Sequence, residues 1–125
     1  MKVRRHFTRA GEGPYQGLSF EKRSSEIRNP DGRVIFHNED VTVPSSWSQI
    51  ATDILAQKYF RKTGVPQGGA KGSPGGENDA RQIFHRLAHT WTDWGRRHGY
   101  FDGEEDAQSF YDELCCMLAR QIAAG

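Results

Sequence analysis

A helical segment with its own start and stop signals constrains this fold most strongly. Ser46 followed three residues later by Gln49 forms a capping box, in which each side chain satisfies a backbone N–H group that the first helical turn leaves free. Gly64 suits the left-handed conformation of a helix C-cap, and Pro66 cannot continue a helix. The sequence therefore predicts a helix over residues 46–63.

Apolar side chains recur along this helix at the spacing of one helical face. They are Trp47, Ile50, Ala51, Ile54, Leu55 and Tyr59. We expect this stripe to face the core of the protein.

Residues 17–44, which precede the helix, read as a β-region because β-branched and aromatic residues alternate there with turn formers. Asn29-Pro30-Asp31-Gly32 has the chemistry of a turn, so residues 26–29 should pair with residues 33–36. A second turn at residues 37–40 would admit a short strand through Val41 and Val43. The prediction is a small antiparallel sheet of two or three strands.

Residues 67–77 form a glycine-rich linker between the first helix and the C-terminal part of the chain. A phosphate-binding loop needs a lysine followed directly by Ser or Thr before a helix, whereas Lys71 is followed by Gly72. The linker interpretation is therefore preferred.

Residues 1–16 read as an N-terminal arm.

Residues 78–123 are predicted to form a helical hairpin. The first helix should begin at the N-cap Asn78 and reach His98, and the second should begin with a capping box of Asp102 and Glu105. The expected buried face of the first helix comprises Ala80, Ile83, Phe84, Leu87, Trp91 and Trp94. That of the second comprises Ala107, Phe110, Tyr111, Leu114, Met117, Leu118 and Ile122.

The whole chain of 125 residues fits one α+β domain, a small antiparallel sheet followed by three amphipathic helices. Its formal net charge of +1 gives no overall field to attract nucleic acid or a membrane. The sequence has no long apolar segment and its polar start lacks a signal-peptide core, so we expect a cytoplasmic protein. The oligomeric state stays open.

A basic patch at the N-terminus could contact phosphate or an acidic partner, although short charge runs are usually solvated. The patch comprises Lys2, Arg4, Arg5, His6 and Arg9. A third interpretation is salt-sensitive binding of nucleotides or single strands by Arg4, Arg5 and Arg9 with neighbouring aromatic residues.

Two pairs of potential ligands favour structural roles. His85 and His89 could share a metal ion, but the motif glutamate is missing and we expect cationic neighbours. The adjacent Cys115 and Cys116 project differently from a helix, which disfavours a disulfide between them. We predict two solvent-facing histidines, two reduced packing thiols and no metal site.

Four aromatic residues, Trp91, Trp94, Tyr100 and Phe101, fit core or domain-contact packing better than base stacking. If part of this set is exposed, we expect it to dock on another protein surface. Acidic residues cluster on the last helix, where helix-dipole and solvation roles explain them. They are Glu104, Glu105, Asp106, Asp112 and Glu113.

The order of residues resembles the N-terminal region of adenosylcobalamin-dependent (class II) ribonucleotide reductases. The matching strings are residues 5–11, 14–15, 25–32, 43–66, 75–77, 79–88, 90–91, 94–95, 99–102, 105–107, 110–113 and 117–119. Family members often have a longer segment between residues 66 and 75. Several long strings in one order are far more specific than a single short motif.

The resemblance implies a non-catalytic accessory domain that supports reduction of ribonucleotides to deoxyribonucleotides by the whole enzyme. In the family, the thiyl-radical cysteines and the cobalamin and nucleotide-specificity sites belong to a large catalytic barrel that comes after this region. No catalytic residue therefore transfers to this chain, and we expect it to bind no cofactor itself. The expected partner is that barrel, in the same polypeptide or in another.

The alternative is a free-standing binding module that meets a reductase chain or an unrelated protein. It would use the aromatic residues Trp91, Trp94, Tyr100 and Phe101, or the basic arm with Arg4 and Arg5.

Overall fold

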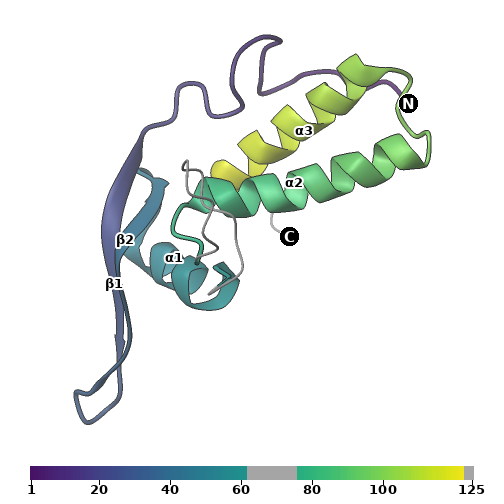
Figure 1. Ribbon diagram of the computed structural model, residues 1–125. Coiled ribbons are helices and arrows are strands. Elements are labelled where there is room, and N and C mark those ends of the chain that lie inside the picture. The colour runs from purple at the N-terminus through teal and green to yellow at the C-terminus, as the bar shows by residue number, and fades with distance from the viewer. Residues whose placement is uncertain (62–75, 123–125) are drawn as a thin grey trace, which may run out of the picture. The chain divides into compact units, whose positions relative to one another are not determined.

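The computed structural model describes residues 1–61 and 76–122 and confirms an α+β arrangement of a two-stranded sheet followed by helices (Figure 1). These residues belong to two units, one formed by Met1–Leu18 with Phe84–Gly125 and the other by Ser19–Ile83. We call them the terminal unit and the central unit. The prediction of a single domain is not decided by this division.

The sheet of the central unit is one hairpin of β1 (Phe20–Arg28) and β2 (Val34–Pro44), paired antiparallel. The predicted turn at residues 29–32 is confirmed. Gly32 has φ +86°, a left-handed conformation that favours glycine, and Asp31 Oδ1 accepts a hydrogen bond from the N–H of Arg33 at 3.0 Å. Turn chemistry that is local in sequence thus sets the hairpin.

The second predicted turn, at residues 37–40, is wrong, because these residues belong to strand β2. Between the pairs Arg23–Val41 and Ser25–Asn38, β2 has one more residue than β1, which makes a β-bulge. Asn38 accepts a hydrogen bond from the N–H of Asp40 at 3.1 Å within it. The turn-forming residues are absorbed by the bulge, and the described sheet has two strands.

The N-cap of the first helix lies two residues later than predicted. Its N-cap is Ser48, whose hydroxyl accepts from the N–H of Ala51 at 3.1 Å, and α1 spans Gln49–Ile54. Gln49 does not reach back to Ser46; its amide donates to the carbonyl of Ser24 on β1 at 2.8 Å. A tertiary contact has replaced the expected capping box.

A π-helical turn, η1 (Leu55–Tyr59), continues α1, and the chain becomes extended at Phe60. The predicted helix is therefore too long, while its expected stop at Gly64 and Pro66 lies outside the described residues. The predicted stripe is also partly wrong, since Ile50, Ile54 and Tyr59 are exposed. The buried residues here are Trp47, Thr52, Leu55, Ala56 and Phe60.

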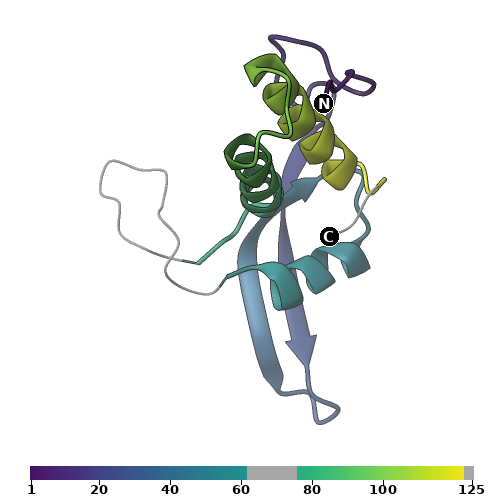
Figure 2. The same cartoon turned by 90° about the vertical axis from the view of Figure 1, so that its right-hand side faces the viewer.

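Arg23 ties the hairpin to the loop that leads into α1. Its guanidinium donates to the carbonyls of Ser45, at 2.9 Å, and Trp47, and to the hydroxyl of Thr52 at 3.0 Å. Thr52 is fully buried, as are Val41 and Val43 on β2. In both views α1 lies beside the hairpin (Figures 1 and 2). The core of the central unit therefore sits between the hairpin and α1.

Arg61 and Glu77, the residues on either side of the undescribed segment, are joined by two hydrogen bonds. The N–H of Arg61 donates to Glu77 Oε1 and the N–H of Glu77 donates to the Arg61 carbonyl, both at 2.8 Å. The predicted linker at residues 67–77 lies mostly outside the described residues. We call this pair of bonds the Arg61–Glu77 clasp.

The second helix, α2 (Ala80–Arg97), begins one residue later than its predicted cap implied. Asp79 rather than Asn78 is the cap, since its carboxylate accepts from the N–H of Arg81 at 2.9 Å. Gln82 Oε1 in turn accepts from the N–H of Asp79 at 3.0 Å, which completes a capping box. Close to the cap, the N–H of Thr42 donates to the Asn78 carbonyl at 2.8 Å, so this cap belongs to the central unit.

In the terminal unit, α2 and α3 (Glu104–Ala119) form the predicted antiparallel hairpin (Figure 1). The Cys115 thiol lies 3.9 Å from the Phe84 carbonyl, and at the other end Phe101 covers Gly95. The predicted cap of α3 is wrong: the N-cap is Gly103 and makes no side-chain cap bond. The Asp102 carboxylate instead accepts from the backbone nitrogen of Met1.

The buried face of α2 is rotated relative to the prediction. Phe84, Ala88, Thr92 and Gly95 are buried, whereas Trp91 and Trp94 are exposed. On α3 the buried surface is wider than one stripe, and Ile122, beyond its end, is exposed. It comprises Ala107, Ser109, Asp112, Glu113, Leu114, Cys115, Cys116, Leu118 and Ala119.

Replacing Arg23 by Ala should lower the free energy of unfolding by about 2–3 kcal/mol, because the carbonyls of Ser45 and Trp47 lose a charged donor. Urea unfolding followed by circular dichroism measures the change. Lys22→Ala, at an exposed neighbour on β1, is the control and should shift stability by no more than about 0.5 kcal/mol. Equal effects from both substitutions would contradict the role assigned to Arg23.

Candidate functional site

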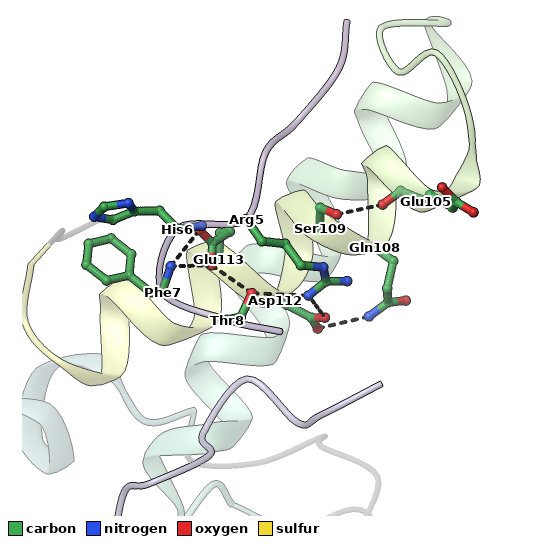
Figure 3. Close-up of polar contacts among 9 residues, drawn as sticks. All are labelled: Arg5, His6, Phe7, Thr8, Glu105, Gln108, Ser109, Asp112 and Glu113. Atoms are coloured by element: carbon green, nitrogen blue, oxygen red, sulfur yellow. Dashed lines mark hydrogen bonds and ion pairs between the residues drawn. The ribbon is translucent and has the colours of Figure 1, made fainter. Parts of the chain in front are cut away.

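The N-terminal arm is bound along α3 by carboxylates. The N–H of Val3 donates to Asp106 Oδ1 at 2.9 Å, and Met1 contacts Asp102 just before the helix. The next contacts, at Asp112 and Glu113, lie further along α3 (Figure 3). The arm therefore follows α3 in the same direction as the helix.

Glu113 is the centre of this attachment and is only 8 % exposed. Its carboxylate accepts from the N–H of Phe7 at 2.9 Å, from the N–H of His6 and from the Thr8 hydroxyl at 2.7 Å. Burial alone would raise the pKa of Glu113. The Thr8 hydroxyl and the backbone N–H groups of the arm outweigh burial and lower this pKa below its ordinary value. Glu113 is held as an anion.

Asp112 is buried beside Glu113 and binds the guanidinium of Arg5 (Figure 3). Arg5 Nη1 donates to Asp112 Oδ2 at 2.8 Å and to the Thr8 hydroxyl at 3.1 Å, while Gln108 donates to Asp112 Oδ1 at 2.9 Å. We call Arg5, His6, Phe7 and Thr8 with Asp112 and Glu113 the arm clamp. Its acids are engaged by protein donors, which gives them a structural rather than a proton-transfer role.

The arm clamp corrects the sequence interpretation of these acids. Asp112 and Glu113 were expected on a solvated face, but they are buried and bound. Glu104 and Glu105, in the first turn of α3, are exposed as expected. A pairing between Arg5 and Asp112 spans 107 residues of sequence, and no local pattern announces it.

The basic patch is divided between two environments. Arg5 is largely buried in the arm clamp, whereas Arg4 is exposed. Arg4 could therefore meet a partner directly, while Arg5 could do so only by leaving Asp112. Docking by either residue stays a prediction.

The aromatic candidates also separate. Trp91, Trp94 and Tyr100 are 39 %, 54 % and 60 % exposed, and we call these three the aromatic face. Phe101 belongs instead to the packing of the helical hairpin, with its ring 5.6 Å from that of Phe110. Trp91 and Trp94 are three residues apart on α2, so they project to the same side of the helix.

His85 and His89 are exposed, as expected, and their rings stack with centroids 5.1 Å apart. His85 Nδ1 lies 2.6 Å from the Tyr111 hydroxyl. Burial, and then the charge of His89, lower the pKa of His85. The described residues contain no group of three or more potential metal ligands among His, Cys, Asp and Glu.

Cys115 and Cys116 are free and buried. Burial raises the pKa of the Cys115 thiol, which keeps it protonated at neutral pH. A protonated, enclosed thiol is a poor nucleophile, so the packing interpretation of Cys115 fits its surroundings.

Among the described helices, none is long and apolar enough to cross a membrane.

Replacing Glu113 by Gln should loosen the arm and cost about 1–3 kcal/mol of stability, because the arm donors lose a charged acceptor. Hydrogen exchange at the amides of His6 and Phe7 should accelerate. Glu105→Gln, on the exposed first turn of the same helix, is the matched control and should leave those amides unchanged. Protected amides in the Glu113 variant would show that the carboxylate does not hold the arm.

The arm clamp should also make stability depend on pH. Because folding lowers the pKa of Glu113, its contribution is complete above the unfolded value of about 4.3 and is lost as pH falls through the folded value. Glu113→Gln should therefore flatten the loss of unfolding free energy in acid. Denaturant titrations between about pH 6 and about pH 2.5, a range that brackets the unfolded pKa of Glu113, test this. Parallel curves for both proteins would refute it.

Comparisons with known proteins find the same family that the order of residues resembles. The family model described as class II vitamin B12-dependent ribonucleotide reductase matches residues 21–121. The vitamin B12-dependent ribonucleotide reductases of Bradyrhizobium diazoefficiens and Agrobacterium fabrum are 44 % and 45 % identical to the chain. Each match covers 99 % of this chain but 12 % of the relative, over 150 aligned positions. The Rhodopirellula baltica protein of the same name is 36 % identical over 91 % of this chain and 10 % of its own length.

The chain thus spans about one eighth of the length of the first two relatives. The alignments with them are longer than the chain, so the relatives have additional residues within the matched region. The family model covers β1 from its second residue on, β2 and all the described helices. The chain belongs to the class II vitamin B12-dependent ribonucleotide reductase family and corresponds to its N-terminal domain.

Proposed function

We propose that this chain is a non-catalytic accessory domain that docks on the catalytic barrel of a class II ribonucleotide reductase, in the same polypeptide or in another. It supports the reduction of ribonucleotides to deoxyribonucleotides by the whole enzyme. Adenosylcobalamin serves the barrel and is not bound by this domain. Family membership supports the assignment of the reaction, and the exposed aromatic face supports the assignment of the docking surface.

The chemistry of the described side chains supports a non-catalytic role. The buried carboxylates of Asp112 and Glu113 are engaged by the arm, and the Cys115 thiol is kept protonated by burial. These groups hold the fold together instead of facing a substrate. The radical chemistry of the whole enzyme therefore belongs to another part of it.

The hollow described beside the arm does not suit adenosylcobalamin, which supports this part of the proposal. The hollow has a volume of about 340 Å³, which is at the lower end of small-molecule sites and is too small for a corrin macrocycle with its appended nucleotide. Its lining has no imidazole or thiol to bind cobalt. The lining residues are Phe7, Thr8, Arg9, Glu12, Gly13, Pro14 and Gln16.

The aromatic face is the observation that carries the docking proposal. Trp91 and Trp94, on one side of the C-terminal half of α2, are 39 % and 54 % exposed, and Tyr100, which follows the helix, is 60 % exposed. Trp and Tyr are enriched in protein interfaces and among the residues that contribute most to binding, because they bury a large area and lose little side-chain entropy. Exposing them together in water favours their burial against a partner.

The test removes the matching N-terminal region from a full-length class II reductase and supplies this chain in trans. We expect assembly or deoxyribonucleotide formation to fall on removal and to recover with the chain. A chain with Trp91→Ser and Trp94→Ser should need at least about tenfold higher concentration for the same recovery, since it lacks two interface aromatics. Recovery is measured as the rate of deoxyribonucleotide formation at increasing concentrations of the added chain.

His89→Ser is the matched control, because it removes an exposed ring from another position on α2. It should restore activity at the wild-type concentration. Unchanged activity and assembly after removal of the region would overturn the accessory role. Equal recovery by the tryptophan variant would overturn docking through the aromatic face.

A further inference from the structure

The central unit has a second apolar surface, on the outer side of α1. Ile50 and Ile54 are 73 % and 48 % exposed, and Lys58, four residues further, is exposed as well. Residues four apart are neighbours on a helix surface, so these three side chains form one row. We call Ile50, Ile54 and Lys58 the outer row.

Contacts within the central unit fix the direction in which this row points. Gln49 donates to the Ser24 carbonyl, and Asp53 accepts from the Ser25 hydroxyl at 2.7 Å, so both polar residues face β1. Thr52 and Leu55 are buried in the same unit. With these sides of the helix engaged by the hairpin and the core, the isoleucines are held on the remaining side.

The π-turn brings two more side chains of this segment into the core. The N–H of Phe60 donates to the Leu55 carbonyl at 3.1 Å, an i to i+5 bond, and both side chains are buried. In an α-helix, five residues turn through about 500°, which would put Leu55 and Phe60 on different sides. The wider turn brings both inward, while Ile50, Ile54 and Lys58 stay exposed. Such π-turns are frequent at functional sites.

We propose that the outer row is a second docking surface for the same partner, the catalytic part of a class II ribonucleotide reductase. The inference rests on the proposed function. The chemistry of the row predicts the surface that it meets: an apolar patch for Ile50 and Ile54 with an acidic group beside it for Lys58.

The family match supplies the argument for this occupant. The matched region of the family includes α1 and η1, and in the first two relatives this region is part of a polypeptide about eight times longer. Each unit of the domain then has a surface for the rest of the enzyme, the aromatic face on the terminal unit and the outer row on the central unit. Contact through both units would fix the orientation of the domain as well as its position.

The test measures association of the chain with a class II reductase that lacks its own matching region, by sedimentation or by anisotropy of a labelled chain. The double variant Ile50→Ser, Ile54→Ser should bind at least about tenfold more weakly. Serine and isoleucine have similar helix propensity and both sites are exposed, so the melting temperature of the free variant should be unchanged. Val34→Ser, at an exposed apolar position on β2, should bind like wild type.

Lys58→Glu should weaken binding further, and the loss should shrink as salt is added, because it reverses one exposed charge. Wild-type affinity of the double variant, with weaker binding by the Trp91 and Trp94 variant, would overturn the outer row and leave the proposed function intact. Failure of the wild-type chain to bind would overturn both. A free chain that is dimeric and becomes monomeric in the double variant would assign the row to a second copy instead.

Discussion

Each unit places charged side chains among buried neighbours, and the cost of leaving such a charge unpaired determines how adjoining segments run. In the terminal unit, Glu113 gathers backbone N–H groups from an arm that has no strand or helix of its own. In the central unit, Arg23 gathers the carbonyls of the loop before α1. The described residues contain no buried side-chain polar atom without a partner, so both charges are fully accommodated.

Where local chemistry decides the structure, the sequence was a sufficient guide. The turn at residues 29–32 needs a residue in the left-handed backbone conformation at its last position, and Gly32 stands there. The helical hairpin follows from two amphipathic segments joined by a short connection, and the α+β class follows from their order after a hairpin. The caps failed for a different reason: Gln49 and Asp102 each had a tertiary partner that competed successfully with the local one.

The candidate site was predictable to the same extent. The aromatic residues near the end of α2 could be named, but helical periodicity could not show which side of α2 meets α3, and it placed Trp91 and Trp94 inside. The arm clamp was missed because its partners are more than a hundred residues apart and their types suit solvent equally well. The exposure of the isoleucines of α1 was missed because Gln49 and Asp53 turn the helix toward β1 through tertiary hydrogen bonds that the residue pattern does not show.

The Arg61–Glu77 clasp has a consequence for how this family changes length. Since residues 61 and 77 are bonded directly to each other, we expect the geometry of η1 and of the α2 cap to depend little on how many residues separate them. Closing a longer connection between fixed ends costs only about 0.6 kcal/mol for each doubling of its length. We therefore expect the interval to accept insertions, so that a fluorescent or affinity module could be grafted there.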